Sequence, residues 1–215
     1  MDTKIYIADT TPLFNEDYYN TLVKKLPSWR REKAARYKNA ATRTASAGAF
    51  LLLMHALESQ GLNIAEPEFF YGEHKKPYLK GYEDIHFNLS HSGRRVMCII
   101  GDSENGCDIQ SIEKNGDRIA MRFFHKNETA YLSSIPEESA RRLAFHKIWC
   151  VKESYLKALG TGLSKELKSF EVDIENEIII PRDPKFNIKI YCVDPEYVCS
   201  AAANSLPDDI ETYRF

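Results

Sequence analysis

The 215-residue sequence predicts an α/β (α+β) fold in which two similar halves occupy one chain. Segments with helical and with strand-like hydrophobic patterns alternate along its length, which is typical of mixed α/β proteins. In addition, "RRVMCIIGDS" at 94–103 resembles "EYVCSAAANS" at 196–205, and each follows a long helical segment and several strand-like ones. A duplicated α/β unit explains this echo. Two unrelated hydrophobic strands that look alike explain it as well, so the echo alone leaves both interpretations open.

The first half is expected to begin with a short alternating strand at 4–9. A helical pattern follows from Asn15 to about Lys38, and a more apolar helix covers 42–61, where Gly61 is a typical C-terminal residue. Short strands are then expected at 69–73, 76–80 and 86–90. Residues 95–113 join two β-rich runs through the turn-forming sequence "DSENG", which predicts a hairpin.

The second half is expected to contain helices at 118–124 and 128–135 and a long helix at 138–160, which Gly160 closes. Strands are expected at 170–180, 186–194 and 197–205. No segment between them is long and polar enough to be a disordered linker. We therefore divide the chain into an N-terminal half, residues 1–104, and a C-terminal half, residues 105–215.

The composition is that of a globular protein, with 43% hydrophobic and 28% charged residues and enough chain to bury a core. A net charge of −2 does not favour nucleic-acid binding. The five cysteines form no C-x-x-C pair, so neither a zinc site nor a disulfide framework is indicated. The N-terminus lacks a signal-peptide pattern, and the longest apolar run, 45–57, is too short to cross a bilayer. We therefore expect a cytoplasmic protein with no membrane partner.

The long helix carries a charged pair opposite its apolar side. The residues expected to form one buried stripe are Ile148, Val151, Tyr155 and Leu159. At about 100° per residue, Glu153 and Lys157 lie roughly 140–180° around from that stripe. They are also i, i+4 neighbours, and a surface ion pair worth about 0.3–0.5 kcal/mol would explain them. The alternative is that both side chains face a binding site.

Asp108 is unusual because Asp is disfavoured in strands. On a strand at 105–110, alternation places Asp108 and Gln110 on one face and Cys107 and Ile109 on the other. Oxygen ligands on one strand face suit Mg²⁺, which takes one or two carboxylates and completes its shell with water and substrate phosphates. A strand-end Asp that points to solvent is the simpler alternative, and this segment by itself favours it.

Two further segments suit anions. Ser90, His91 and Ser92 precede Gly93, and a turn there offers hydroxyl, imidazole and backbone N–H groups to a phosphate. A polar turn bonded to its own backbone explains the same residues equally well. Residues 24–43 carry eight basic side chains against one acidic one. A solvated helix face is the usual explanation of such a run, but the imbalance also predicts a surface that attracts phosphates or an acidic protein.

Four ordered motifs resemble the 4′-phosphopantetheinyl transferase family, in particular its surfactin-synthetase-activating type. They are "FNLSHSGRRV" (87–96), "GCDIQSIEK" (106–114), "AMRFFHKNE" (120–128) and "WCVKESYLKALGTGLSKELKSFEV" (149–172). The match runs from about Leu26 to Val172, with a weaker echo at 193–203. No single motif is specific, but four in this order and at this spacing are.

The resemblance implies transfer of the phosphopantetheine arm of coenzyme A to a serine of an apo acyl or peptidyl carrier protein, with release of adenosine 3′,5′-bisphosphate. It also implies a monomer with two similar halves related by a pseudo-twofold axis, like the subunits of a dimer, and with the site between them. The N-terminal half would contact the nucleotide and phosphates of coenzyme A, and the C-terminal half would hold the metal and the catalytic residues.

The resemblance also implies roles for single residues. Asp108 and Glu153 would share a Mg²⁺, with Gln110 as a third position. Many relatives carry Glu at the position of Gln110, so the ligand role of Gln110 stays open. Glu153 is implied as the base that takes the serine proton, and Lys157 as the residue that neutralises the phosphate nearest the reaction.

Coenzyme A is implied to contact the remaining site residues. Ser90 and His91 match the phosphate-contacting turn, and His91 is also a catalytic candidate. The other implied contacts are Lys76 and Pro77 with the cofactor, and Lys33, Arg43 and Thr44 with the nucleotide and its 3′-phosphate. Glu128 lies in the region expected to meet the carrier protein, but we interpret it as a first-turn helix acid after an Asn127 cap.

Overall fold

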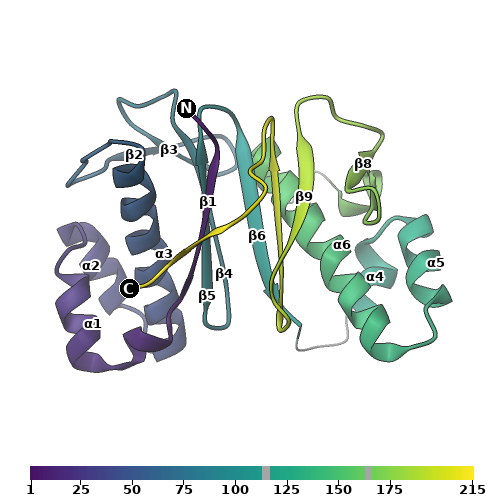
Figure 1. Ribbon diagram of the computed structural model, residues 1–215, viewed down its shortest axis with the longest axis horizontal. Coiled ribbons are helices and arrows are strands. Elements are labelled where there is room, and N and C mark those ends of the chain that lie inside the picture. The colour runs from purple at the N-terminus through teal and green to yellow at the C-terminus, as the bar shows by residue number, and fades with distance from the viewer. Residues whose placement is uncertain (113–116, 163–165) are drawn as a thin grey trace.

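Two β-sheets lie face to face in the middle of the molecule, and helices cover their outer faces (Figure 1). The computed structural model describes residues 1–112, 117–162 and 166–215. Glu113 and Lys114 of the second motif and residues 163–165 of the fourth lie outside these ranges. The helices of the described chain are α1 (Glu16–Val23), α2 (Ser28–Ala35), α3 (Ala40–Ser59), α4 (Asp117–Phe123), α5 (Lys126–Ser134) and α6 (Glu138–Leu159).

The first sheet has the strand order β11-β1-β5-β4, and the second has the order β6-β10-β9. The strands of the first sheet are β1 (Lys4–Asp9), β4 (His86–Ser92), β5 (Arg95–Gly101) and β11 (Glu211–Tyr213). Those of the second are β6 (Asn105–Ser111), β9 (Asn187–Asp194) and β10 (Tyr197–Ala203). Two small hairpins accompany them: β2 (Phe69–Tyr71) with β3 (Pro77–Leu79), and β7 (Glu171–Asp173) with β8 (Ile178–Ile180).

The same order of elements occurs twice along the chain. A strand, a long helix, a small hairpin and two antiparallel strands form β1–α3–β2–β3–β4–β5, and the series recurs as β6–α6–β7–β8–β9–β10. The segments with similar sequences form β5 and β10, which are the middle strands of the orders β1-β5-β4 and β6-β10-β9. The predicted α/β class is thus confirmed. The division at residues 104 and 105 stays a prediction, and β11 departs from it because it pairs in parallel with β1 of the first sheet.

Alternating apolar residues explain the layers. In β5, Cys98 and Ile100 pack under α3, whereas Met97 and Ile99 point to the second sheet. The core between the sheets also takes Ile109 of β6. A strand that is buried on both faces has a nearly continuous run of apolar residues. Both β5 and β10 are buried on both faces and have such a run, which only Ser200 interrupts in β10.

The predicted hairpin at 95–113 is wrong in its pairing. Both runs form strands, but β5 is hydrogen-bonded to β1 and β4, while β6 is bonded to β10. Both edges of β5 are therefore occupied, and the short link at 102–104 carries the chain from one sheet to the other. The helix expected from Asn15 to Lys38 is likewise interrupted: α1 ends before Pro27, and α2 begins directly after it.

The two sheets meet along a seam, which we define as the junction of β4 with β6. There, polar side chains of β4 replace a ladder of backbone hydrogen bonds. At 3.0–3.3 Å they accept the backbone N–H groups of every second residue of β6, in the pairs Asn88–Cys107, Ser90–Ile109 and Ser92–Ser111. The strand expected at 86–90 continues through Ser92, and the turn lies at Gly93, whose φ is +52°. The seam brings β4 side chains directly to Asp108.

None of the helices in the described residues combines the length and apolarity needed to cross a bilayer.

Candidate active site

Asp108 lies at the seam, buried under α6, and three polar groups converge on its carboxylate. Ser90 donates its hydroxyl to Oδ1 at 2.7 Å, and Lys157 Nζ lies 2.6 Å from the same oxygen. Gln110 Nε2 donates to Oδ2 at 2.7 Å. Asp108 is 2% exposed, so the solvent-facing alternative for this residue is wrong. A buried carboxylate requires such partners because an unpaired charge is costly away from water.

Lys157 reaches the seam from the last turn of α6. Besides Asp108, its ammonium donates to Ser90 Oγ at 3.2 Å and to the Cys107 carbonyl at 3.1 Å. Burial works against the positive charge, but the carboxylate of Asp108 outweighs it and raises the pKa of Lys157. The simple surface pair of Glu153 with Lys157 is therefore wrong, because Lys157 pairs with Asp108 instead.

Gly106 explains why α6 lies so close to β6. A Cβ atom at this position would lie 2.1 Å from the Ser154 carbonyl oxygen and 2.4 Å from the Ala158 nitrogen, so any side chain would displace the helix. Glycine at the start of "GCDIQ" therefore allows the last two turns of α6 to rest on the strand that carries Asp108. The Cys150 thiol, which donates to the Asp108 carbonyl at 3.1 Å, marks the same close contact.

Glu153 is half-buried on the same face of α6 as Lys157, one turn earlier. Burial raises the pKa of Glu153, and the like charge of Asp108 adds to that effect, so the two carboxylates are close enough to repel each other. Within the described part of the chain, no side chain forms an ion pair or hydrogen bond with the Glu153 carboxylate. Glu153 is thus available to a cation or to a proton.

His91 follows Ser90 on β4, and because side chains alternate along a strand, its exposed imidazole lies on the face opposite to that of Ser90. Desolvation lowers the pKa of His91, and the positive charges of Lys157 and Arg30 add to that effect. The shift indicates that both basic side chains are close enough to His91 to disfavour its protonation. The site therefore contains two carboxylates, a lysine and a serine, drawn from β4, β6 and α6, and His91 lies next to Ser90 on the other face of β4.

Comparison with known proteins identifies the family. A family model described as the 4′-phosphopantetheinyl transferase superfamily matches residues 104–202. The 4′-phosphopantetheinyl transferase ffp of Bacillus subtilis is 36% identical over 219 residues, which cover 96% of each chain. This chain belongs to the 4′-phosphopantetheinyl transferase superfamily. Its surfactin-synthetase-activating type is supported by Sfp of Bacillus subtilis (strain 168), which is 35% identical over 192 residues, or 84% of each chain.

A solved structure is similar at a lower level. The holo-[acyl-carrier-protein] synthase of Thermotoga maritima is 19% identical, with a TM-score of 0.39, and the match covers 46% of this chain and 61% of that one.

The residues expected at the nucleotide end of this transferase lie on and around α2 and α3. Lys33 is exposed on α2, and Arg43 lies half-buried in the first turn of α3, where its guanidinium pairs with Glu16 and covers the Tyr19 ring. Thr44 does not join them. Its side chain is fully buried, and its hydroxyl donates to the Ala41 carbonyl at 3.1 Å, so the expected nucleotide contact of Thr44 is not supported.

Lys76 also differs from the expectation. It was expected to contact the cofactor, but it is 7% exposed, and its ammonium is held by three oxygen atoms of this chain. Pro77 begins β3 and is half-buried beside it, paired in register with Tyr71. The "KP" pair therefore supports the β2–β3 hairpin, and its lysine points into the protein.

Glu128 corrects another expectation. It is a first-turn acid of α5, but the cap is His125 instead of Asn127, and the Glu128 carboxylate is buried. Its carboxylate pairs with Lys152 Nζ at 2.8 Å and accepts the Val172 N–H at 2.7 Å. Glu128 therefore cannot offer its charge to a partner protein.

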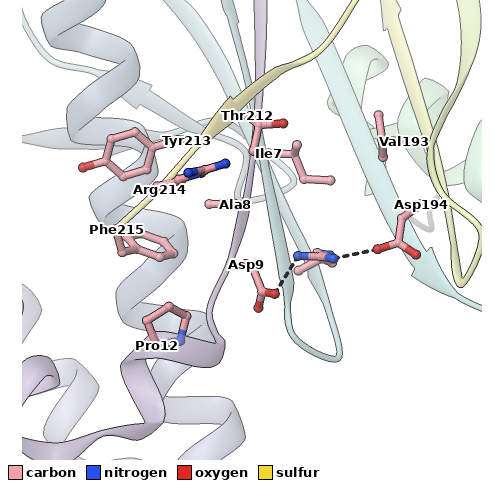
Figure 2. Close-up of a pocket in the computed structure, with 11 residues that line it drawn as sticks. Ile7, Ala8, Asp9, Pro12, Val193, Asp194, Thr212, Tyr213, Arg214 and Phe215 are labelled. Carbon is pink, nitrogen blue, oxygen red and sulfur yellow. Dashed lines mark hydrogen bonds and ion pairs between the residues drawn. The ribbon is translucent and has the colours of Figure 1, made fainter.

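A cavity of about 440 Å³ lies away from this site, beside β11 and between β1 and β9 (Figure 2). None of the predicted site residues lines it. Arg95 of β5 also lines it and forms ion pairs of 2.8 Å to Asp9 of β1 and 2.6 Å to Asp194 of β9, so it joins the two sheets. We interpret this cavity as part of the contact between the halves, because its charges neutralise one another.

Sequence reasoning missed the residues that organise the site. Asn88 and Ser92 accept hydrogen bonds from β6 at the seam. Gly106 lets α6 pack closely on β6, and Glu104 forms an ion pair with Lys76. Only Gly106 left a signal, because a glycine inside a strand often marks a close approach of two backbones.

Proposed function

We propose that this transferase moves the 4′-phosphopantetheine arm of coenzyme A to a serine of an apo acyl or peptidyl carrier protein, with Mg²⁺, and releases adenosine 3′,5′-bisphosphate. The observation that carries the proposal is the convergence of Asp108, Glu153 and Lys157 at the seam, in a chain that shares 35–36% identity with named 4′-phosphopantetheinyl transferases. Transfer of a phosphoryl-type group depends mainly on positioning and charge neutralisation, which such residues supply.

The donor set fits Mg²⁺. Within residues 1–112, 117–162 and 166–215, no three His, Cys, Asp or Glu side chains form a metal-binding group. Mg²⁺ does not need one, because it takes one or two carboxylates and keeps water and substrate phosphates as its other ligands. Asp108 and Glu153 provide two carboxylates that repel each other in a half-buried site, which favours a cation between them. Bound there, Mg²⁺ would neutralise the developing charge of the diphosphate.

The side chains of this chain account for the remaining chemistry. Lys157 provides a fixed positive charge for the phosphate nearest the reaction, and its raised pKa keeps it protonated. Glu153 is the proposed acceptor of the proton of the attacking serine, because no ion pair or hydrogen bond to a side chain of the described residues occupies its carboxylate. Ser90 offers its hydroxyl to the phosphates beside Lys157, and His91 is the proposed phosphate contact from the next position of β4.

The nucleotide end of coenzyme A would lie toward the basic surface of α2 and the start of α3. Lys33 and Arg43 are the proposed contacts to the nucleotide and its 3′-phosphate, and Pro77 supports the neighbouring hairpin. Arg30 of α2 is close enough to lower the pKa of His91, which supports a path for a polyanion from α2 toward β4. In this proposal, residues 1–104 hold most of the coenzyme A contacts, and residues 105–215 hold the metal and the base. We further propose a cytoplasmic monomer without nucleic-acid or membrane partners.

The test is mass spectrometry of an apo carrier protein incubated with the chain, coenzyme A and Mg²⁺. We expect the carrier to gain one phosphopantetheine on a serine, together with adenosine 3′,5′-bisphosphate in equal amount. Omission of Mg²⁺ with added chelator should stop both products. Coenzyme A binding without any mass gain would instead identify a binding protein that has lost catalysis, and the proposed reaction would be wrong.

Gln110 should matter less than Asp108. Asp108→Ala removes a carboxylate from the cation and the partner of Lys157, and should lower kcat/KM on the order of 100-fold, roughly 2.7 kcal/mol. Gln110→Ala removes one hydrogen bond to the Asp108 carboxylate but takes no charge away from the cation, so a smaller loss, about tenfold, is expected at saturating Mg²⁺. The measurement is kcat/KM against Mg²⁺ concentration.

Gln110→Glu is the matched variant in this series, because it adds a carboxylate of the same size and should lower the Mg²⁺ concentration needed for half-maximal rate. If Gln110→Ala is as inactive as Asp108→Ala, Gln110 is a required ligand and the two-carboxylate site is wrong.

A further inference from the structure

The Lys76 ammonium is almost fully buried and is surrounded by three oxygen acceptors of this chain. Its Nζ forms an ion pair with Glu104 and donates to the carbonyls of Asn105 at 2.9 Å and Ala158 at 3.1 Å. An ammonium has three N–H donors, so these acceptors use all of them. Only 6% of the side chain is exposed.

The Glu104 carboxylate contacts three side chains of this chain. Its carboxylate binds Lys76 and accepts the Tyr78 hydroxyl at 3.0 Å, and His86 Nδ1 lies 3.5 Å away. These partners outweigh the effect of burial and lower the pKa of Glu104 to about 2. Glu104 is therefore ionised at any physiological pH and remains a permanent counter-charge for Lys76.

The two carbonyls that Lys76 binds belong to the two elements that carry the site. Asn105 begins β6 three residues before Asp108, and Ala158 follows Lys157 in the last turn of α6. A Cβ on Gly160, the residue that ends α6, would lie 3.3 Å from the Lys76 side chain, so the lysine also packs against the helix end. Lys76 lies in the β2–β3 hairpin of the N-terminal half. From there its side chain binds both the start of β6 and the end of α6.

We propose that Lys76 and Glu104 are positioning residues that fix β6 against α6, and with them the contact of Asp108 with Lys157, and that the Lys76 ammonium does not bind coenzyme A. This inference rests on the proposed function. The reason is the energy of the alternative: if the ammonium turned toward a phosphate, the Asn105 and Ala158 carbonyls would lose their buried donor and Glu104 would lose its ion pair.

The test is a double-mutant cycle of Lys76→Met and Glu104→Ala, assayed well below the melting temperature of every variant. Each single variant should lower kcat about 10- to 100-fold, because small displacements of reacting groups have effects of that size. KM for coenzyme A should change less than about threefold, because no cofactor contact is lost. The double variant should be no worse than the worse single one, because both changes break the same set of contacts.

The chain offers a matched control on the same hairpin. Lys80 and Glu68 form a 2.8 Å ion pair whose side chains are 66% and 71% exposed. The variants Lys80→Met and Glu68→Ala remove the same chemical groups and should change neither kcat nor the melting temperature, because exposed pairs contribute little.

Two results would overturn the inference. A higher KM for coenzyme A in Lys76→Met with unchanged kcat would make Lys76 a cofactor contact. Additive losses in the double variant would mean that the residues act separately. If the unmodified chain transfers nothing to the carrier, the proposed function fails on its own, and the melting temperatures of the same four proteins still decide the pairing. Non-additive shifts support it, and additive shifts overturn it.

Discussion

Glu153→Gln is expected to abolish measurable transfer while the fold stays intact. Gln has the same shape but cannot take the serine proton or bring a negative charge to the cation, and loss of a general base typically lowers the rate about 10²- to 10⁴-fold. Stability should not fall, because burial raises the pKa of Glu153, so the ionised carboxylate works against folding at neutral pH and the neutral amide removes that effect. Single-turnover transfer and thermal melts measure the two quantities.

Glu138→Gln is the matched control, since it makes the same chemical change at an exposed position in the first turn of the same helix. It should retain full activity and change stability by less than about 0.5 kcal/mol. Near-normal turnover of Glu153→Gln would show that another group takes the proton. A lower melting temperature would show that the Glu153 carboxylate has a stabilising partner.

Helix α6 was predictable from the sequence because its signals are local. The apolar stripe repeats at helical spacing, and Gly160 adopts a φ of +68°, which ends the helix as a C-terminal glycine does. The positions of Glu153 and Lys157 opposite the stripe also follow from geometry alone. Their partners do not, because Asp108 lies about 50 residues away in sequence and reaches Lys157 only through the packing of β6 on α6.

Strand pairing was harder to predict for the same reason. The runs at 95–101 and 105–111 each have strand composition, and "DSENG" between them is a turn sequence, so local rules predict a hairpin. Instead, β5 pairs with β4, the strand just before it, and with the distant β1, while β6 pairs with the distant β10. Side-chain patterns do not say which edge a strand will use. Lys76 shows a similar limit, because a motif predicts that a lysine is present but not whether its ammonium points to ligand or protein.

Glu128→Ala is expected to lower the free energy of unfolding by about 3–5 kcal/mol, because it leaves a buried ammonium without its counter-charge. The Glu128 and Lys152 side chains are 1% and 0% exposed. Burial acts against both charges and raises the pKa of Glu128 while it lowers that of Lys152, so neither residue tolerates the loss of the other. The Ala variant also leaves the His125 and Val172 N–H groups without their acceptor. Urea unfolding at neutral pH measures the change.

A variant that removes both charges but keeps most of the side-chain volume distinguishes the contribution of the ion pair to stability from that of packing. Glu128→Met combined with Lys152→Met should be less destabilised than Glu128→Ala, because replacing a buried pair with apolar groups avoids desolvation. The Lys152 ammonium also donates to the Leu167 and Phe170 carbonyls at 2.8 Å, so the double variant should still unfold more easily than the original chain. Loss of less than about 1 kcal/mol in Glu128→Ala would mean that these two carbonyls alone hold Lys152, and that α5 is joined to α6 by apolar packing without help from the ion pair.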